Sequence, residues 1–225
     1  ETVPEALINW WLDRGITIQE GYGMTETAAA GAMLQKADIP HMIGSAGRAL
    51  MHSRIKIVDG DGNEVPRDTP GEIWFKGLSV TPGYWRNPKA NAESFTDGWF
   101  HSGDIGRMDK DGYIYIEDRV KDMYISGGEN VYPAEIEGLL YELDQIVEVA
   151  VIGIEDERWG ETGCVCAVVK AGETLSLEDV LTHLDGRMAK FKLPSHVHLM
   201  AELPRGGTGK VLKFELRKAV PSLLG

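Results

Sequence analysis

Hydrophobic and polar positions follow three successive patterns along the chain. Residues 4–14 place apolar side chains at helical spacing, with Pro4 in the first turn and Gly15 as a stop, which predicts a helix. A short strand is expected at 16–18. Residues 25–34 are small and apolar, which favours a loop that passes into a helical turn.

From about Ser45 the pattern changes to short alternating or β-rich runs, which are typical of strands. The four runs are 54–59, 71–76, 105–109 and 113–118. Asp-Gly and Pro-Gly turn signals separate them, and a helical insertion that starts near Pro88 occupies 87–95. We expect this part of the chain to form a small distorted barrel or sandwich.

Beyond a charged run at 118–122 the pattern becomes α+β. Helices are expected at 133–142, at 176–189 and from Phe214, and strands at 147–154, 164–170 and 196–200. The predicted fold class is therefore mixed, α/β to α+β, with a domain boundary near Lys121.

This boundary lies in the stretch D-R-V-K-D-M-Y-I-S-G-G-E-N-V-Y-P, residues 118–133. A charged run between two ordered segments is a natural place for a domain to pivot. Gly127 and Gly128 follow a short apolar run, and glycine there allows a positive φ or the close approach of a ligand. Taken alone, the stretch can also be a strand, a turn and a helix start with no further role.

The net charge narrows the choice of partners. The 225 residues carry a formal charge of −12, which argues against nucleic acid as a partner of the whole surface. Residues 187–218 hold eight basic residues against two acidic ones, a net charge of +6, so the rest of the chain carries −18. A basic tail on an acidic body suits a polyphosphate ligand, and solvated lysines on two helices are the alternative.

The sequence also bears on the cellular setting. No apolar run approaches the roughly 18 residues of a membrane span, and no signal peptide is expected. Cys164 and Cys166 lie at i and i+2 on one face of an expected strand, a poor geometry for a mutual disulfide. A cytoplasmic location is expected. Because the chain starts at Glu1 without Met, we interpret it as a piece of a longer protein.

The stretch Gly21–Glu26 (G-Y-G-M-T-E) follows an expected strand, so we test it against the dinucleotide fingerprint. The fingerprint fails, because its third glycine would stand at the position of Glu26. Thr25 and Glu26, a hydroxyl followed by a carboxylate, fit Mg²⁺ and phosphate oxygens better. A tight turn capped by Thr25 is the alternative.

Two further stretches carry candidate chemistry. Gly103 and Asp104 are expected to close a turn before a strand, where the carboxylate suits a ribose diol or else forms an Asx-turn. Leu203–Lys210 (L-P-R-G-G-T-G-K) fails as a P-loop, because Pro204 and Val211 stand where that motif needs Gly and Ser or Thr. It is a glycine-rich loop that presents Lys210, as a site residue or as an exposed loop lysine.

Four stretches together resemble the adenylate-forming enzymes, which comprise acyl- and aryl-CoA synthetases, luciferases and the adenylation domains of peptide synthetases. They are Q-E-G-Y-G-M-T-E (19–26), G-W-F-H-S-G-D-I-G (98–106), the 118–133 stretch and L-P-R-G-G-T-G-K (203–210), in the order the family uses. The resemblance covers essentially the whole chain. Family members are considerably longer, so it implies a missing N-terminal domain that carries a Ser/Thr/Gly-rich phosphate loop.

The resemblance implies three parts. Residues 1–44 would be the C-terminal edge of the large nucleotide- and acyl-binding domain, and 45–120 a β-rich, barrel-like subdomain. Residues 121–225 would be a mobile C-terminal α+β domain with a small sheet and flanking helices, and Lys121 would be its hinge.

The resemblance also implies which residues bind the nucleotide: Tyr22, Gly23, Met24, Thr25, Asp104 and Arg119. Tyr22 would stack on adenine, and Asp104 and Arg119 would hold the ribose. Thr25 would contact the α-phosphate and Glu26 would serve Mg²⁺. Lys210 would contact the substrate carboxylate and the α-phosphate, where a lysine stabilises crowded negative charge.

The positions that resemble the CoA site of relatives are Ser126, Gly127, Gly128, Trp159, Phe191 and Lys192. An aromatic face can stack on adenine and a lysine can meet a ribose phosphate. A Trp beside a turn is otherwise a packing residue. Leu193 departs from the family pattern, because some relatives carry Arg there.

The resemblance implies an acid–thiol ligase, an AMP-forming acyl-CoA synthetase that uses ATP, Mg²⁺ and CoA. The substrate would be a carboxylic acid, with a fatty acid favoured. The small residues 28–32 are compatible with a tunnel for a long chain and equally with simple close packing, so they do not identify the acid. The chain alone is expected to be inactive. Two alternatives stay open: a non-catalytic nucleotide- or CoA-binding piece, and an adenylation domain that acts on an amino or aryl acid with a carrier-protein thiol.

Overall fold

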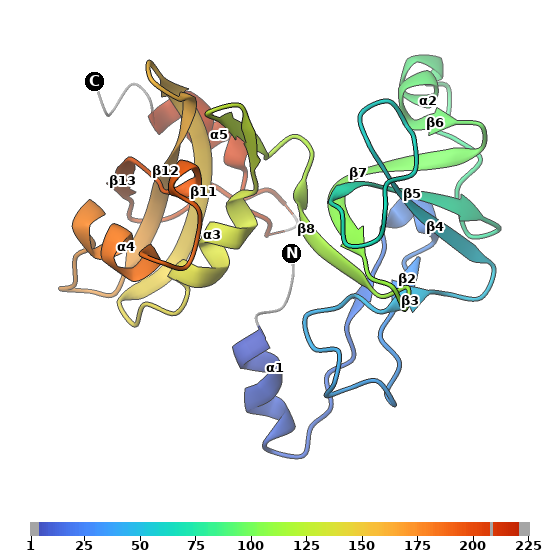
Figure 1. Cartoon of the computed structure of the whole chain (residues 1–225), viewed down its shortest axis with the longest axis horizontal. Coiled ribbons are helices and arrows are strands. Elements are labelled where there is room, and N and C mark those ends of the chain that lie inside the picture. The colour runs from blue at the N-terminus through green and yellow to red at the C-terminus, as the bar shows by residue number, and fades with distance from the viewer. Residues whose placement is uncertain (1–4, 208, 221–225) are drawn as a thin grey trace. The chain divides into compact units, whose positions relative to one another are not determined.

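The computed structural model describes residues 5–207 and 209–220. The chain divides into two compact units with the boundary between Val120 and Lys121, coloured blue to green and yellow-green to red in Figure 1. Each unit is described by itself. The three-part organisation, with its further boundary at residue 44, stays a prediction.

The first unit starts with a helix, α1 (Glu5–Leu12), and a small antiparallel sheet. The strands of this sheet are β1 (Gly21–Tyr22), β2 (Ala32–Met33) and β3 (Arg48–Ala49). The strand expected at 16–18 is wrong. Pairing starts only at Glu20, whose carbonyl oxygen accepts from the Leu34 N–H at 2.8 Å, while Ile16 is exposed. A 3₁₀ turn, η1 (Thr25–Thr27), follows β1.

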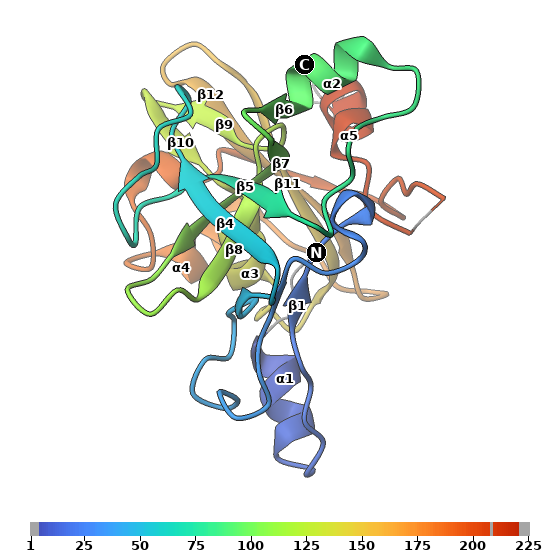
Figure 2. The ribbon, with the colours of Figure 1, turned by 90° about the vertical axis from the view of Figure 1, so that its right-hand side faces the viewer.

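A five-stranded antiparallel sheet forms the body of the first unit. Its strands are β4 (Ser53–Val58), β5 (Gly71–Gly77), β6 (Phe95–Thr96), β7 (Trp99–Met108) and β8 (Ile114–Arg119). Their order is β4-β5-β7-β6, and β8 pairs with the other part of β7; β4 and β5 lie side by side in Figure 2. The expected helical insertion is present as α2 (Pro88–Ser94), which Asn87 caps through its side chain.

Strand β7 is much longer than the run expected at 105–109. It starts at Trp99 because its first residues pair with β6 on one edge and with β5 on the other, whereas β8 pairs only from Asp104 onward. Gly103 and Asp104 therefore lie inside a strand, and the expected turn before a strand is wrong at this point. Register shifts on both edges mark bulges near Asp104, which bend the strand and re-aim its side chains.

The second unit contains a five-stranded sheet flanked by helices. Its strands are β9 (Tyr124–Ser126), β10 (Glu129–Val131), β11 (Ile146–Asp156), β12 (Gly160–Val169) and β13 (His196–Leu199). The order is β10-β9-β12-β11, and β13 pairs with β12 in parallel. Helices α3 (Pro133–Leu140), α4 (Leu177–Leu184) and α5 (Lys213–Ala219) and the 3₁₀ turn η2 (Lys190–Lys192) complete this unit.

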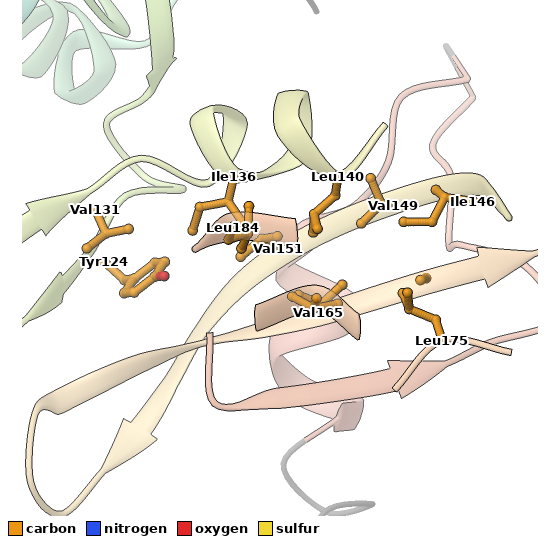
Figure 3. Close-up of a cluster of buried hydrophobic side chains, with 12 residues drawn as sticks. Tyr124, Val131, Ile136, Leu140, Ile146, Val149, Val151, Val165, Leu175 and Leu184 are labelled. Atoms are coloured by element: carbon orange, nitrogen blue, oxygen red, sulfur yellow. The ribbon is translucent and has the colours of Figure 1, made fainter. Parts of the chain in front are cut away.

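Side-chain alternation along β11 and β12 gives this sheet two buried faces. On one face, Val149 and Val151 pack with Ile136 and Leu140 of α3, as Figure 3 shows, and with residues of α4. On the other face, Ala150, Ile152 and both cysteines pack with Leu216 of α5. Cys164 and Cys166 are free thiols on this one face, as their spacing predicts.

Helix α4 is shorter than the expected 176–189. Ser176 and Asp179 form a capping box at its start, but the helix ends at Leu184 and Gly186 adopts a positive φ of 70°. The mixed fold class is confirmed by the two sheets and their helices. None of the helices among residues 5–207 and 209–220 is both apolar enough and long enough to span a bilayer.

Candidate functional site

In the first unit the candidate ribose residues form one cluster. Asp104 stands opposite Arg119 in the β7–β8 register, and the Arg119 Nε donates to Asp104 Oδ1 at 3.2 Å. The Tyr22 hydroxyl donates to Asp104 Oδ2 at 2.6 Å. Burial and the neighbouring Asp104 carboxylate raise the pKa of Tyr22, so this residue stays a neutral donor. The carboxylate is thus held between one neutral donor and one cation.

The backbone around Asp104 is fixed as well. Gly103 has a φ of 70°, and its N–H donates to Glu72 Oε1 at 2.9 Å. Its carbonyl oxygen accepts from the Val120 N–H at 2.9 Å. The side chain of Asp104 is only 13% exposed, whereas that of Arg119 is 50% exposed. A ligand hydroxyl that reached Asp104 would meet an acceptor already set in position.

The turn after Tyr22 presents Thr25 outward. The buried Thr27, rather than Thr25, caps the turn: its hydroxyl accepts from the Met24 N–H at 3.0 Å and donates to the Met24 carbonyl at 3.1 Å. The alternative of a turn capped by Thr25 is therefore wrong. Thr25 is exposed, and Gly23 lies so close to Ala29 that an added Cβ would come within 2.2 Å of its carbonyl oxygen.

Glu26 has a partner that the sequence did not suggest. The hydroxyl of Tyr84 donates to Glu26 Oε1 at 2.9 Å, and the Thr81 N–H donates to the Glu26 carbonyl at 2.8 Å. Tyr84 lies in the loop between β5 and α2, and nothing in the hydrophobic pattern separates it from a packing tyrosine. Only a pairing 58 residues apart in sequence reveals its role.

In the second unit the glycine turn and a tryptophan come together. Gly127 and Gly128 connect β9 and β10 with positive φ values of 62° and 87°. The Gly127 N–H donates to the Trp159 carbonyl at 2.8 Å, and a Cβ on Gly127 would lie 2.9 Å from the Trp159 ring. Only glycine fits there without moving the indole, so the bare backbone predicted at this turn lies against Trp159.

The other candidate CoA residues have structural partners. Ser126 is buried beside this turn. Phe191 lies on η2 and packs against the core under α3 and α4. Lys192 pairs with Glu135 at 2.6 Å and is 22% exposed. Their assignment to CoA stays a prediction.

Lys210 sits on an exposed loop of the second unit. The Gly206 N–H donates to the Lys210 carbonyl at 2.9 Å, and Arg205 bridges with Val211 across the loop. Arg205 also donates to Glu148 Oε1 at 2.7 Å and to the Gly209 carbonyl at 2.5 Å. Thr208 of this loop lies outside the described residues. The loop backbone is tied to β11 while the Lys210 side chain points to solvent.

Lys121 lies between two anchored residues. Val120 is tied within the first unit through its bond to Gly103, and Asp122 is held within the second unit by Arg217, which donates to its carbonyl at 2.9 Å and to Oδ1 at 3.2 Å. Lys121 itself is exposed. The assignment of Lys121 as a hinge stays a prediction.

Glu26 and Thr25 fit a magnesium ion that arrives with a nucleotide. Mg²⁺ prefers hard oxygen ligands and is often bound by one or two carboxylates together with substrate phosphates. Glu26 supplies one carboxylate, and Tyr84 bonds only its Oε1. No group of three or more His, Cys, Asp or Glu with metal-binding geometry occurs among the described residues. Within the described residues, Glu26 therefore offers a single carboxylate rather than part of a protein cage.

Two family models match the chain. The model of the AMP-binding enzyme matches residues 1–85, and that of the AMP-binding enzyme C-terminal domain matches residues 135–210. The indoleacetate–CoA ligase of Aromatoleum aromaticum is 46% identical over 97% of this chain and 43% of its own length. The long-chain-fatty-acid–CoA ligase FadD13 of Mycobacterium tuberculosis is 42% identical over 96% of this chain and 42% of its own length.

Solved structures agree with these matches. The o-succinylbenzoate CoA synthetase of Bacillus subtilis with its acyl-adenylate intermediate superposes with a TM-score of 0.92 at 34% identity, over 97% of this chain and 45% of that one. The same synthetase with ATP and a magnesium ion gives 0.88 at 33% identity, over 98% and 44%. The chain thus spans less than half the length of these relatives. It belongs to the AMP-binding enzyme family.

Proposed function

We propose that the whole protein activates a carboxylic acid with ATP and transfers the acyl group to CoA. In the first half-reaction a carboxylate oxygen attacks the α-phosphorus and the bond to pyrophosphate breaks, which gives an acyl-adenylate. In the second half-reaction the CoA thiol loses its proton, its sulfur attacks the acyl carbon, and AMP leaves. Adenylation replaces hydroxide, the poor leaving group of the free acid, with AMP, which is a good leaving group. The proposal rests on three hydrogen-bonded side chains, those of Tyr22, Asp104 and Arg119, because a fixed carboxylate beside a guanidinium suits a ribose diol.

The residues of the first unit would bind the nucleotide. Tyr22, Gly23 and Met24 would border the adenine, and Asp104 with Arg119 would accept from and donate to the ribose hydroxyls. Thr25 would donate its exposed hydroxyl to the α-phosphate. Thr25 and Glu26 would hold Mg²⁺, which when bound neutralises phosphate charge.

The residues of the second unit would act at the reacting groups. Lys210 would stabilise the negative charge that gathers as the carboxylate approaches phosphorus. The turn at Ser126, Gly127 and Gly128, with Trp159, would line the path of the CoA arm, and Phe191 and Lys192 would lie near its nucleotide. A change of backbone direction at Lys121 would serve the two half-reactions in turn.

The experiment separates the half-reactions in the whole protein. Acid-dependent exchange of pyrophosphate into ATP is expected, followed by CoA thioester formation from a preformed adenylate. ATP binding without acid-dependent exchange would favour the alternative of a binding protein without turnover. The same exchange with a carrier-protein thiol in place of CoA as the acceptor would favour the adenylation domain of a peptide synthetase. Run on the 225 residues alone, the assay is expected to give no turnover.

The local packing bears on the choice between a long-chain tunnel and simple close packing at the small residues 28–32. An added Cβ on Gly31 would come within 2.2 Å of the Phe75 ring, and Ala32 is fully buried. Close packing within the first unit thus accounts for these two small residues. We therefore propose a carboxylic acid of open class, and a panel of long-chain, arylacetic and succinylbenzoic acids in the exchange assay decides among them.

A further inference from the structure

Tyr84 stands out because a loop tyrosine reaches the carboxylate that the proposed function assigns to Mg²⁺. Its hydroxyl donates to Glu26 Oε1 at 2.9 Å, although the two residues are 58 positions apart. The phenol thus directs its own proton to Glu26.

One side-chain amide, that of Asn91, hydrogen-bonds both the N–H and the carbonyl of Tyr84. Asn91 of α2 accepts from the Tyr84 N–H at 2.6 Å through Oδ1, and it donates to the Tyr84 carbonyl at 3.2 Å through Nδ2. Gly83 leaves space for the Asn91 amide, since a Cβ at position 83 would lie 3.0 Å from Asn91 Oδ1. Helix α2 therefore fixes the backbone position of Tyr84.

The ring and hydroxyl of Tyr84 are held too. The ring meets Phe95 edge to face at 6.4 Å and packs against the hydrophobic core of the first unit. The hydroxyl is held by the hydrogen bond that it donates to Glu26. A donor that is fixed at both ends can set the orientation of the acceptor that it binds.

Resting on the proposed function, we propose that Tyr84 is a positioning residue for the metal. By binding Glu26 Oε1, Tyr84 leaves Oε2 as the oxygen that Glu26 offers to the cation, and Asn91 holds Tyr84 in place from α2. Partners of metal-ligating carboxylates typically change metal affinity by about 10-fold to 100-fold when they are removed. Helix α2, far along the chain from the G-Y-G-M-T-E stretch, thereby becomes part of the metal site.

The test measures metal affinity without turnover. The whole protein is loaded with a non-hydrolysable ATP analogue and titrated with Mn²⁺, an oxygen-seeking stand-in for Mg²⁺, by electron paramagnetic resonance. Tyr84→Phe removes one hydroxyl and keeps the ring, and it should weaken Mn²⁺ binding by about 10-fold. Binding of the analogue in EDTA should stay unchanged, because Tyr84 acts only through the metal ligand.

A matched control removes another tyrosine hydroxyl of the same unit. Tyr115 contacts Met42 Sδ at 3.9 Å, and Tyr115→Phe should leave Mn²⁺ affinity at the wild-type value. Asn91→Ala is a second variant that keeps the Tyr84 hydroxyl but loosens its backbone, and it should weaken Mn²⁺ binding less than Tyr84→Phe does. Wild-type affinity in folded Tyr84→Phe would overturn the proposal.

Glu26→Gln separates this inference from the function on which it rests. If Tyr84 acts through Glu26, the double variant Tyr84→Phe/Glu26→Gln should bind Mn²⁺ no more weakly than Glu26→Gln alone. Additive losses would overturn the positioning role while leaving Glu26 as the metal ligand. Wild-type Mn²⁺ affinity in Glu26→Gln would instead overturn the metal assignment within the proposed function.

Discussion

The side chains of Asp104 and Lys210 differ in burial and in how they are held. Asp104 is mostly buried, and both of its oxygens accept hydrogen bonds from side chains. Lys210 is exposed, while the loop around it is held by backbone bonds and by the Arg205 side chain. The difference suits the proposed roles. Asp104 would bind the ribose in both half-reactions, whereas Lys210 would be needed in one half-reaction only.

This comparison has a physical basis. A site that binds the same sugar in both half-reactions gains from preorganisation, because its side chains lose no further freedom when the ligand arrives. A lysine that must leave the reacting centre between the half-reactions gains from the absence of fixed partners, each of which would have to break. The following variants break or sharpen the comparison.

The largest effect is expected for Lys210→Ala. Loss of one preorganised electrostatic contact should slow acyl-adenylate formation by about 100-fold or more. Thioester formation from a synthetic acyl-adenylate should survive, because the proposed role of Lys210 lies in the first half-reaction alone. Lys170→Ala, which removes another exposed lysine of the second unit, is the control and should be silent. Equal losses in the two half-reactions would contradict the assignment to one of them.

Lys121→Pro tests whether the change between half-reactions passes through the boundary. Proline fixes φ near −65° and restricts Val120 before it, so the backbone should stay in one arrangement. We expect pyrophosphate exchange to continue and CoA acylation of preformed adenylate to fall by roughly 10-fold or more, the scale of a blocked conformational step. Lys121→Ala permits both arrangements and should be mild. If both variants slow the two half-reactions alike, Lys121 is a contact rather than a pivot.

Asp104→Ala should act on the nucleotide alone. The loss of a hydrogen-bonded charged group costs about 2 kcal/mol, which corresponds to roughly a 30-fold rise in the KM for ATP. The preference among carboxylic acids should not change, since Asp104 is assigned to the sugar. Steady-state kinetics over ATP and over an acid panel measure both quantities. An altered acid preference at unchanged KM for ATP would place Asp104 in the acyl pocket.

Much of the fold could be predicted from the sequence because local signals decide it. Alternating apolar residues and Asp-Gly turns give β4 and β5, and the Gly127–Gly128 pair marks the β9–β10 turn. The expected strand at 16–18 failed, because β-branched residues form a strand only where a partner lies beside them, and backbone pairing of this segment begins only at Glu20, with Leu34. The early start of β7 could not be predicted for the same reason, since pairing with β5 and β6 decides it.

The candidate site divides along the same line. Tyr22, Asp104 and Arg119 could be chosen because each lies in a stretch that resembles a known motif, and the structure brings the three together. Tyr84 could not be chosen, because its role arises from one side-chain contact across the fold. Asn91 reads as an ordinary polar residue of a helix until its amide is seen on the Tyr84 backbone. Residues within a motif can therefore be predicted individually from the sequence, whereas the residues that hold them in place are found only from contacts in the folded structure.

The smallest effect is expected for Arg205→Ala, which bears directly on how the Lys210 loop is held. Arg205 and Glu148 form an ion pair of 2.7 Å, but their side chains are 40% and 31% exposed. Pairs of this exposure contribute about 1 kcal/mol or less, so Arg205→Ala should slow acyl-adenylate formation by no more than about 5-fold. Glu148→Gln should give a similar change.

Salt gives that last prediction a second readout. Because a half-exposed ion pair is screened by mobile ions, the gap between wild type and Arg205→Ala should narrow as ionic strength rises from 0.05 M to 0.5 M, where the Debye length falls to about 4 Å. A loss in Arg205→Ala as large as that in Lys210→Ala, and insensitive to salt, would mean that the loop works only when Arg205 holds it. The Lys210 loop would then be as preorganised as the Asp104 cluster, and a lysine released between half-reactions would have to be freed by breaking that bond.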